Sequence, residues 1–327
     1  MATITGRVGL PALGRGVRVT WGFLRDAPTI PTLILGILVF VAIFANLIAP
    51  HDPLARVQPT AEDCRLAFGF ENCPAINERP PVGFTDRQVV AGQERIRIGS
   101  WDTPLGTDYQ GRDMLSRLMY GARISLLVSL VGTLVAGAIG TVLGVIAGYF
   151  GKWWDVVIMR ITDAWLTLPT LVFAILLSSM KDSNSIWDIV VILAVVFWSR
   201  YARLVRGEVL TLRERDFIRL AEVNGVSKMR IMARHLIPNV MNTVIVFFTL
   251  IVGVAIIIEA NLSFLGLGIR PPNPAWGLMI QQGQDALFKG NWWLAVFPGI
   301  CIALLVLSAN LFGDWMRVRL DPQLRNR

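Results

Sequence analysis

The amino-acid sequence predicts an all-α polytopic membrane protein with six transmembrane helices. Of its 327 residues, 54% are hydrophobic and 17% are charged, whereas soluble domains usually carry about 25% charged residues. Apolar runs that approach or exceed the length needed to cross a bilayer, about 20 residues, recur along the chain. The six expected spans are 30–49, 124–150, 156–180, 186–201, 240–260 and 292–312.

The distribution of basic residues predicts the orientation of these spans. Lys and Arg in short loops mark the cytoplasmic side. With six spans, the N-terminal tail, the segment after the fourth span and the C-terminal tail share one side. They carry Arg7, Arg15, Arg18, Arg25, Arg200, Arg203, Arg206, Arg213, Arg215, Arg219, Lys228, Arg230, Arg234, Arg317, Arg319, Arg325 and Arg327. The short segments opposite carry only Lys181, Arg270 and Lys289. We therefore expect both termini in the cytoplasm, and the net charge of +8 indicates topology rather than nucleic-acid binding.

The long segment 50–121 is then external. It is rich in proline and polar residues and shows no sustained helical period, so we expect an irregular loop or a small folded cap. It contains Cys64 and Cys73. In an oxidising envelope compartment these could form a disulfide, and two free thiols are the equally open alternative.

Several features within the spans predict packing rather than chemistry. Small residues recur at every fourth position in Gly132, Ala136, Gly140, Gly144 and Gly148, which permits close helix approach. Because four residues advance about 40° beyond a full turn, we expect this stripe to contact more than one neighbouring helix.

Charged residues are few within the spans. Arg160 and Asp163 are three residues apart, so we expect them to pair on one helix face. Glu259 lies near the outer end of the fifth span, where pairing or snorkelling is the expected role. Pro169 should kink the third span.

The sequence lacks the motifs of an enzyme or a nucleotide-binding protein. The stretch GYFGKWW has a Gly-Lys pair but neither the spacing nor the Ser/Thr of a phosphate-binding loop. His51 and His235 are far apart, and three cysteines are too few for a zinc ribbon. We expect no catalytic, cofactor-binding or metal site, and no ATP bound by this chain.

The polar segment between the fourth and fifth spans predicts two short helices joined at Gly225. Residues 209–222 are loosely amphipathic, and glycine can adopt the positive φ that ends a helix sharply. Ser227 then stands at the N-cap of a second helix, which Pro238 is expected to end. The apolar face of this second helix comprises Met229, Met232, Ala233 and Leu236. From these residues alone, a docking hairpin for a partner and an amphipathic helix on anionic lipid remain equally open.

This segment resembles the cytoplasmic loop of permease subunits of binding-protein-dependent ABC importers. The pattern of that family is Glu-Ala-Ala, three residues, Gly, nine residues, then Ile-x-Leu-Pro. Ala221 stands at the second alanine, Gly225 at the glycine and Pro238 at the proline. The chain departs from the pattern at Arg219, Leu220, His235 and Ile237.

Two further stretches resemble the dipeptide, oligopeptide and nickel group of these permeases. They are PLGTDYQGRDMLSRLMYGARISL at 104–126 and EANLSFLGLGIRPPNPAWG at 259–277. The resemblance is to the second (C-type) permease, and it implies the type I ABC importer permease fold. The implied organisation is a cytoplasmic tail (1–29), a first anchor (30–49), the external segment (50–121), a five-helix core (122–313) with a coupling loop (202–239), and a cytoplasmic tail (314–327).

The resemblance also implies partners. These are a second, different permease subunit, two ATPases that bind the ATP, and an external binding protein that delivers cargo. The residues implied to couple to the ATPases are Ala221, Gly225, Met229, Met232 and Pro238. Peptides are the leading cargo, with nickel or oligosaccharides as alternatives. A stand-alone channel or secondary carrier is the rival class, and a carrier would need an ion site at the midplane that the sequence does not show.

Overall fold

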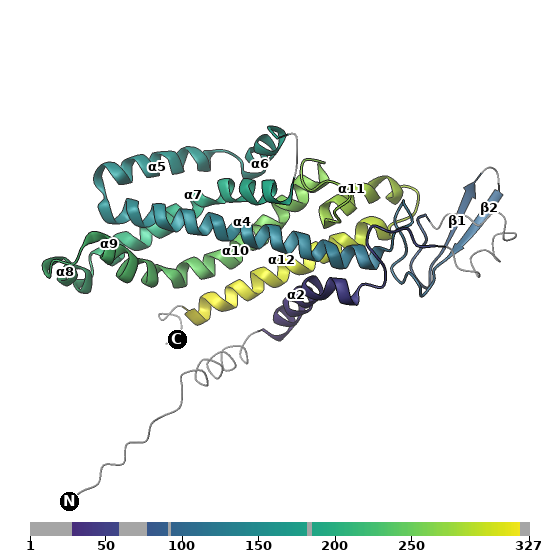
Figure 1. Cartoon of the computed structure of the whole chain (residues 1–327), viewed down its shortest axis with the longest axis horizontal. Coiled ribbons are helices and arrows are strands. Elements are labelled where there is room, and N and C mark those ends of the chain that lie inside the picture. The colour runs from purple at the N-terminus through teal and green to yellow at the C-terminus, as the bar shows by residue number, and fades with distance from the viewer. Residues whose placement is uncertain (1–27, 59–76, 91–92, 182–184, 321–327) are drawn as a thin grey trace, which may run out of the picture.

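A computed structural model describes residues 28–58, 77–90, 93–181 and 185–320 of the chain. Most helices lie roughly lengthwise in one bundle, with a β-hairpin at one end and the short helices α8 and α9 at the other (Figure 1). The elements are α2 (Thr29–Ile48), β1 (Thr85–Val90), β2 (Gln93–Ile98), α4 (Met114–Phe150), α5 (Lys152–Thr167), α6 (Thr170–Ser179), α7 (Ile186–Arg213), α8 (Asp216–Val223), α9 (Lys228–Ile231), the π-helix η2 (Met232–Leu236), α10 (Ile237–Phe264), α11 (Trp276–Leu287) and α12 (Trp293–Leu320).

Four helical stretches in the described part of the chain are long and apolar enough to cross a membrane: Thr29–Ile48, Met114–Phe150, Lys228–Phe264 and Trp293–Arg319. The pair α5 and α6 makes a fifth if it is one broken span. The chain is therefore a mostly helical polytopic membrane protein, as the sequence predicts. Helix α7 corresponds to the fourth predicted span (186–201), but its apolar part lies between Asp188 and Arg200, which is short for a span of about 20 residues. Its crossing of the membrane stays a prediction.

Helix α4 packs along α7 through its glycines. A Cβ added at Gly140 would lie 2.3 Å from the carbonyl oxygen of Trp198, and one added at Gly148 would lie 2.8 Å from the Cβ of Val209. The Cβ positions of Gly132 and Gly144 also point at α7. The expectation that this stripe contacts more than one helix is therefore wrong for these glycines. The stripe turns about 40° around α4 with each step of four residues. Helix α7 stays in contact with the stripe over these steps, so one neighbouring helix covers all four glycines.

The third predicted span is broken at Pro169. Helices α5 and α6 meet there at 91°, a larger bend than the predicted kink, because proline cannot donate the hydrogen bond that would continue the helix. The predicted pairing of Arg160 with Asp163 is wrong. Asp163 instead pairs with Arg203 of α7, and Asp155 accepts two hydrogen bonds from Arg206, at 2.7 and 3.0 Å. Both ion pairs hold α5 against α7.

The described part of the external segment contains a small folded unit. Strands β1 and β2 pair antiparallel, with Thr85 opposite Ile98, so the all-helical expectation does not extend to the cap. Helix α4 begins at Met114, ten residues before the predicted start of the second span at Ile124. Its first turns therefore belong to the segment that was expected as loop or cap. Cys64 and Cys73 lie outside the described residues.

Candidate functional site

The two helices α8 and α9 meet at a sharp turn centred on Gly225. Gly225 has φ of 74°, and its N–H donates to the carbonyl oxygen of Glu222 at 3.0 Å. The N–H of Val226 donates to the carbonyl oxygen of Ala221 at 3.0 Å. These two bonds form the Schellman motif, which satisfies the last carbonyls of a helix and favours glycine at the left-handed position. The predicted helix end at Gly225 is confirmed.

The helix that enters this turn is shorter than the predicted segment 209–222. Helix α7 ends at Arg213, and α8 begins at Asp216 after a break of two residues. Val209 is consequently buried in α7 and does not share a face with the residues of α8. The apolar side chains Phe217, Leu220 and Val223 of α8 are exposed, Val223 at 85%, whereas Ile218 is buried.

The second helix of the hairpin does not end at Pro238. Helix α9, the π-helix η2 and α10 form one helical stretch from Lys228 to Phe264, with Pro238 in the first turn of α10. Within η2 the N–H of Ile237 donates to the carbonyl oxygen of Met232, five residues earlier, which widens the turn. Proline is tolerated in a helix where the preceding turn leaves room for its ring and where no hydrogen bond from its nitrogen is required. The wide turn of η2 leaves this room for Pro238, so the prediction that the helix ends at Pro238 is wrong.

The predicted coupling residues fall on different surfaces of this hairpin. Met229 is 72% exposed, whereas Met232 is 6% exposed and belongs to the main hydrophobic core with Leu236. Ala221 is half-buried against the same core, and Pro238 is exposed. The residues predicted to form one apolar face of the second helix therefore have two different environments. Met232 and Leu236 pack in the core and hold the hairpin against the bundle, whereas Met229 is exposed. The exposed apolar surface is instead made by Phe217, Leu220, Val223 and Met229, and we call these residues the hairpin surface.

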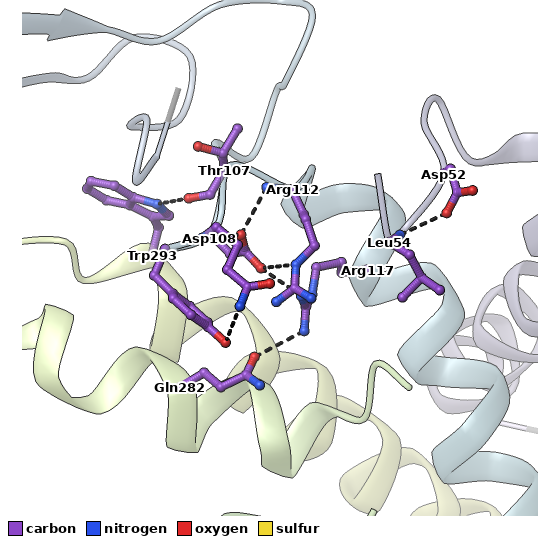
Figure 2. Close-up of polar contacts among 10 residues, drawn as sticks. Asp52, Leu54, Thr107, Asp108, Arg112, Arg117, Gln282 and Trp293 are labelled. Carbon is purple, nitrogen blue, oxygen red and sulfur yellow. Dashed lines mark hydrogen bonds and ion pairs between the residues drawn. The ribbon is translucent and has the colours of Figure 1, made fainter. Parts of the chain in front are cut away.

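At the opposite end of α4, two buried arginines converge on one carboxylate (Figure 2). Arg112 Nε lies 2.7 Å and Arg117 Nη1 lies 2.6 Å from Asp108 Oδ2. The three side chains are between 2% and 7% exposed. Arg117 also donates from Nη2 to Gln282 Oε1 of α11 at 3.1 Å. We call Asp108, Arg112, Arg117 and Gln282 the external cluster, because three of them lie in the segment 50–121 that the sequence predicts to be external.

Further hydrogen bonds fix the start of α4 within the cap. Asp113 is the N-cap of α4 and accepts from the N–H of Ser116 at 2.9 Å, as capping residues do. The indole N–H of Trp293, at the start of α12, donates to the carbonyl oxygen of Thr107 at 3.4 Å. Helices from three distant parts of the sequence are thus joined at one point. Sequence reasoning singled out the stretch 104–126 as a motif but missed the external cluster.

Glu259 is the one carboxylate that the sequence placed within an apolar span near its outer end. It is fully buried and accepts hydrogen bonds from Ser125 of α4 at 3.0 Å and from Ser263 at 2.8 Å. Of the two expected roles, snorkelling to an interface is therefore wrong, and Glu259 is instead paired within the bundle, with serine hydroxyls as its partners. The serine hydroxyls satisfy both carboxylate oxygens, so Glu259 links α10 to α4.

The comparisons with known proteins agree with these motifs. The family model "Binding-protein-dependent transport system inner membrane component" matches residues 140–326. The glutathione transport system permease protein GsiD of Escherichia coli O6:K15:H31 (strain 536 / UPEC) is 37% identical over 290 residues, which is 88% of this chain and 84% of that protein. The proteins of the same name from Shigella boydii serotype 4 (strain Sb227) and Shigella sonnei (strain Ss046) match to the same extent. The resemblance drawn from the sequence is confirmed: the chain belongs to the family of binding-protein-dependent transport system inner membrane components, as a multi-pass permease subunit of an ABC importer.

Proposed function

We propose that this chain is the permease subunit through which an importer moves di- or oligopeptides delivered by an external binding protein. A second, different permease subunit pairs with it in the membrane, and two ATP-binding cassette ATPases dock on the cytoplasmic side. The peptide cargo is supported by the relatives, which are named for the transport of glutathione, a small peptide, and which match over most of their length.

The hairpin surface is the observation that supports ATPase docking. Phe217, Leu220 and Val223 are spaced three residues apart on α8, so they share one face of that helix. This face and Met229 are exposed at the end of the bundle farthest from the cap (Figure 1). Burying apolar surface contributes about 25 cal/mol per Å², and methionine adapts to irregular partner surfaces. A cleft on each ATPase is the partner that we propose for this surface.

Transport then proceeds by alternating access. ATP binding closes the ATPase dimer, the docked hairpins move with it, and the bundle opens toward the other side of the membrane. In this proposal the chain has no catalytic site and holds no cofactor, because the partner subunits bind and hydrolyse the ATP. Both termini lie in the cytoplasm, and the cap with β1 and β2 faces the binding protein. The positions of α8 and the cap at opposite ends of the bundle support this orientation.

Purification of the complex from its native membrane, followed by mass spectrometry, tests the proposal. We expect a second permease and two P-loop ATPases to co-purify, and the reconstituted complex to take up peptides when ATP and the binding protein are present. Recovery of this chain alone, with solute uptake that needs no ATP, would contradict it and would favour a channel or carrier.

Two substitutions sharpen the test of docking. Val223→Asp places a charge on the most exposed residue of the hairpin surface, and Ala221→Asp places one at the half-buried position where α8 contacts the core. We expect both proteins to insert normally, to lose co-purifying ATPases and to lose peptide uptake. Trp101→Asp, which alters an 82% exposed residue in the cap, is the control that should retain the ATPases. Retention of the ATPases and of uptake by Val223→Asp would argue against docking at this surface.

A further inference from the structure

The cytoplasmic end of α4 is bound to the hairpin by side-chain contacts on both sides of the turn at Gly225. The hydroxyl of Tyr149 donates to Glu222 Oε1 in the last turn of α8 at 2.9 Å. The ammonium group of Lys228, at the start of α9, lies 5.9 Å from the ring centre of Phe150, within the range of a cation–π interaction. The last two residues of α4 therefore contact both helices of the hairpin.

Glu222 has a second role in the same place. Its backbone carbonyl accepts the N–H of Gly225 in the turn, while its side chain accepts the hydroxyl of Tyr149. The residue that closes the turn is thus also the residue that holds α4. Tyr149 is 6% exposed, so its ring is fixed within the core and its hydroxyl has a defined position.

These contacts matter because α4 has no short covalent link to the hairpin. The hairpin continues directly into α7 on one side and into α10 on the other, so a movement of the hairpin reaches those helices through the backbone. Tyr149 and Glu222 are 73 residues apart in sequence. A movement of α8 relative to the end of α4 must therefore be passed on by noncovalent contacts.

Helix α4 is built to transmit such a movement over its whole length. It has 37 residues and no proline, which corresponds to about 55 Å at 1.5 Å per residue. Its other end is held in the external cluster by Arg117. A displacement at Tyr149 therefore acts on the helix as one body that reaches the cap.

We propose that Tyr149 and Glu222 are positioning residues that pass the movement of the ATPase-docked hairpin to α4. The inference rests on the proposed function, since it presumes that ATPases move the hairpin. The predicted consequence is specific: without the hydrogen bond, ATPases still dock and hydrolyse ATP, but less peptide is moved for each ATP consumed.

The test compares variants of the full complex in proteoliposomes with the binding protein, ATP and tritiated glutathione as the probe. Tyr149→Phe removes only the hydroxyl, and Glu222→Ala removes the acceptor from an exposed position. We expect each to lower the ratio of peptide taken up to ATP hydrolysed by roughly three- to tenfold, the range expected for loss of one net hydrogen bond. The double variant should be no worse than either single variant, because both remove the same bond.

Two further variants separate this role from a general loss of structure. Glu222→Gln retains a carbonyl oxygen that can accept from Tyr149, so it should restore most of the coupling ratio. Tyr201→Phe removes a buried tyrosine hydroxyl that has no hydrogen-bond partner among the described residues, and it should leave the ratio unchanged. A normal coupling ratio in Tyr149→Phe, or losses that add in the double variant, would overturn the inference while leaving the proposed function intact. A wild-type complex that showed no ATP-driven uptake would contradict both.

Discussion

The two ends of the bundle carry ion pairs in opposite environments. At the cap, Arg112 and Arg117 pair with Asp108 among side chains that are at most 7% exposed. At the hairpin end, Arg219 of α8 pairs with Glu214, which lies just before α8, and the two side chains are 60% and 61% exposed. The same type of interaction is thus buried at one end and open to water at the other.

This difference separates a fixed end from an adjustable one. A buried charge that loses its partner is left in a medium of low dielectric constant, so the pairing is strongly enforced. An exposed ion pair is replaced by water at little cost. The cap end of α4 is therefore held in one geometry, while the hairpin can rearrange its surface contacts when a partner binds.

The largest expected effect comes from removing the shared carboxylate of the external cluster. Asp108→Ala leaves two buried guanidinium groups without their partner, and we expect a loss of about 3–5 kcal/mol in the free energy of unfolding. Tryptophan fluorescence during titration with SDS would measure it. Asp52→Ala, at an exposed position in the same region, is the control and should have little effect. Equal losses for the two variants would show that the cluster is not a fixed point.

A smaller effect on the free energy of unfolding is expected for a substitution in the middle of α4, where it packs on α7. Gly140→Ala places a methyl group 2.3 Å from the Trp198 carbonyl oxygen, so α4 and α7 must separate. Overpacking of this kind costs about 1–3 kcal/mol. Gly207→Ala in α7 adds a methyl group that meets no atom of the described residues within 4 Å, so it should be neutral or stabilising in the same unfolding titration. If both alanines behaved alike, close approach of the two helices would not explain the glycine stripe.

At the hairpin, a third substitution tests the backbone alone. The Cβ of Gly225→Ala would meet no atom within 4 Å, but its φ of 74° is left-handed, which costs about 1–2 kcal/mol for an L-residue. We expect normal insertion with faster proteolysis between α8 and α9 and reduced peptide uptake. Gly36→Ala, which also has free space but lies in α2 without a positive φ, should digest like the wild type. Unchanged proteolysis of Gly225→Ala would argue that the turn relaxes without strain.

The smallest effect is expected for the exposed ion pair. Arg219→Ala should change the free energy of unfolding by less than about 1 kcal/mol, and the change should shrink further in high salt. The SDS titration used for Asp108→Ala gives the direct comparison between the two ends. A loss as large as that of Asp108→Ala would remove the distinction between a fixed end and an adjustable one.

Local sequence rules predicted where helices end better than they predicted which residues are in contact. Gly225 and Pro169 end helices because of their own backbone chemistry, so their positions could be predicted without knowing any neighbour. Pro238 was mispredicted because the π-helix before it makes room for the ring. That accommodation depends on how η2 packs on the core, and spacing alone does not reveal it.

Contacts between distant segments were the harder part. Asp163 was expected to pair within its own helix but pairs with Arg203, 40 residues away. The spacing of Asp108, Arg112 and Arg117 suggested no burial, and the contact of Arg117 with Gln282, 165 residues away, forms only in the folded bundle. Among the predicted coupling residues, the exposure of Met229 and the burial of Met232 likewise depend on how the hairpin packs on the core. Their role in ATPase coupling stays a prediction.

The contacts of the external cluster form at different times during synthesis of the chain. Arg117 and Gln282 are 165 residues apart in sequence. At about 5–20 residues per second, the ribosome needs on the order of ten seconds or more to supply the partner after Arg117 has been made. During that interval Arg117 can pair with Asp108, nine residues earlier, but lacks its hydrogen bond to Gln282. A chain truncated before α11 would keep the ion pair but never gain this hydrogen bond, and we expect it to be degraded faster than the full chain.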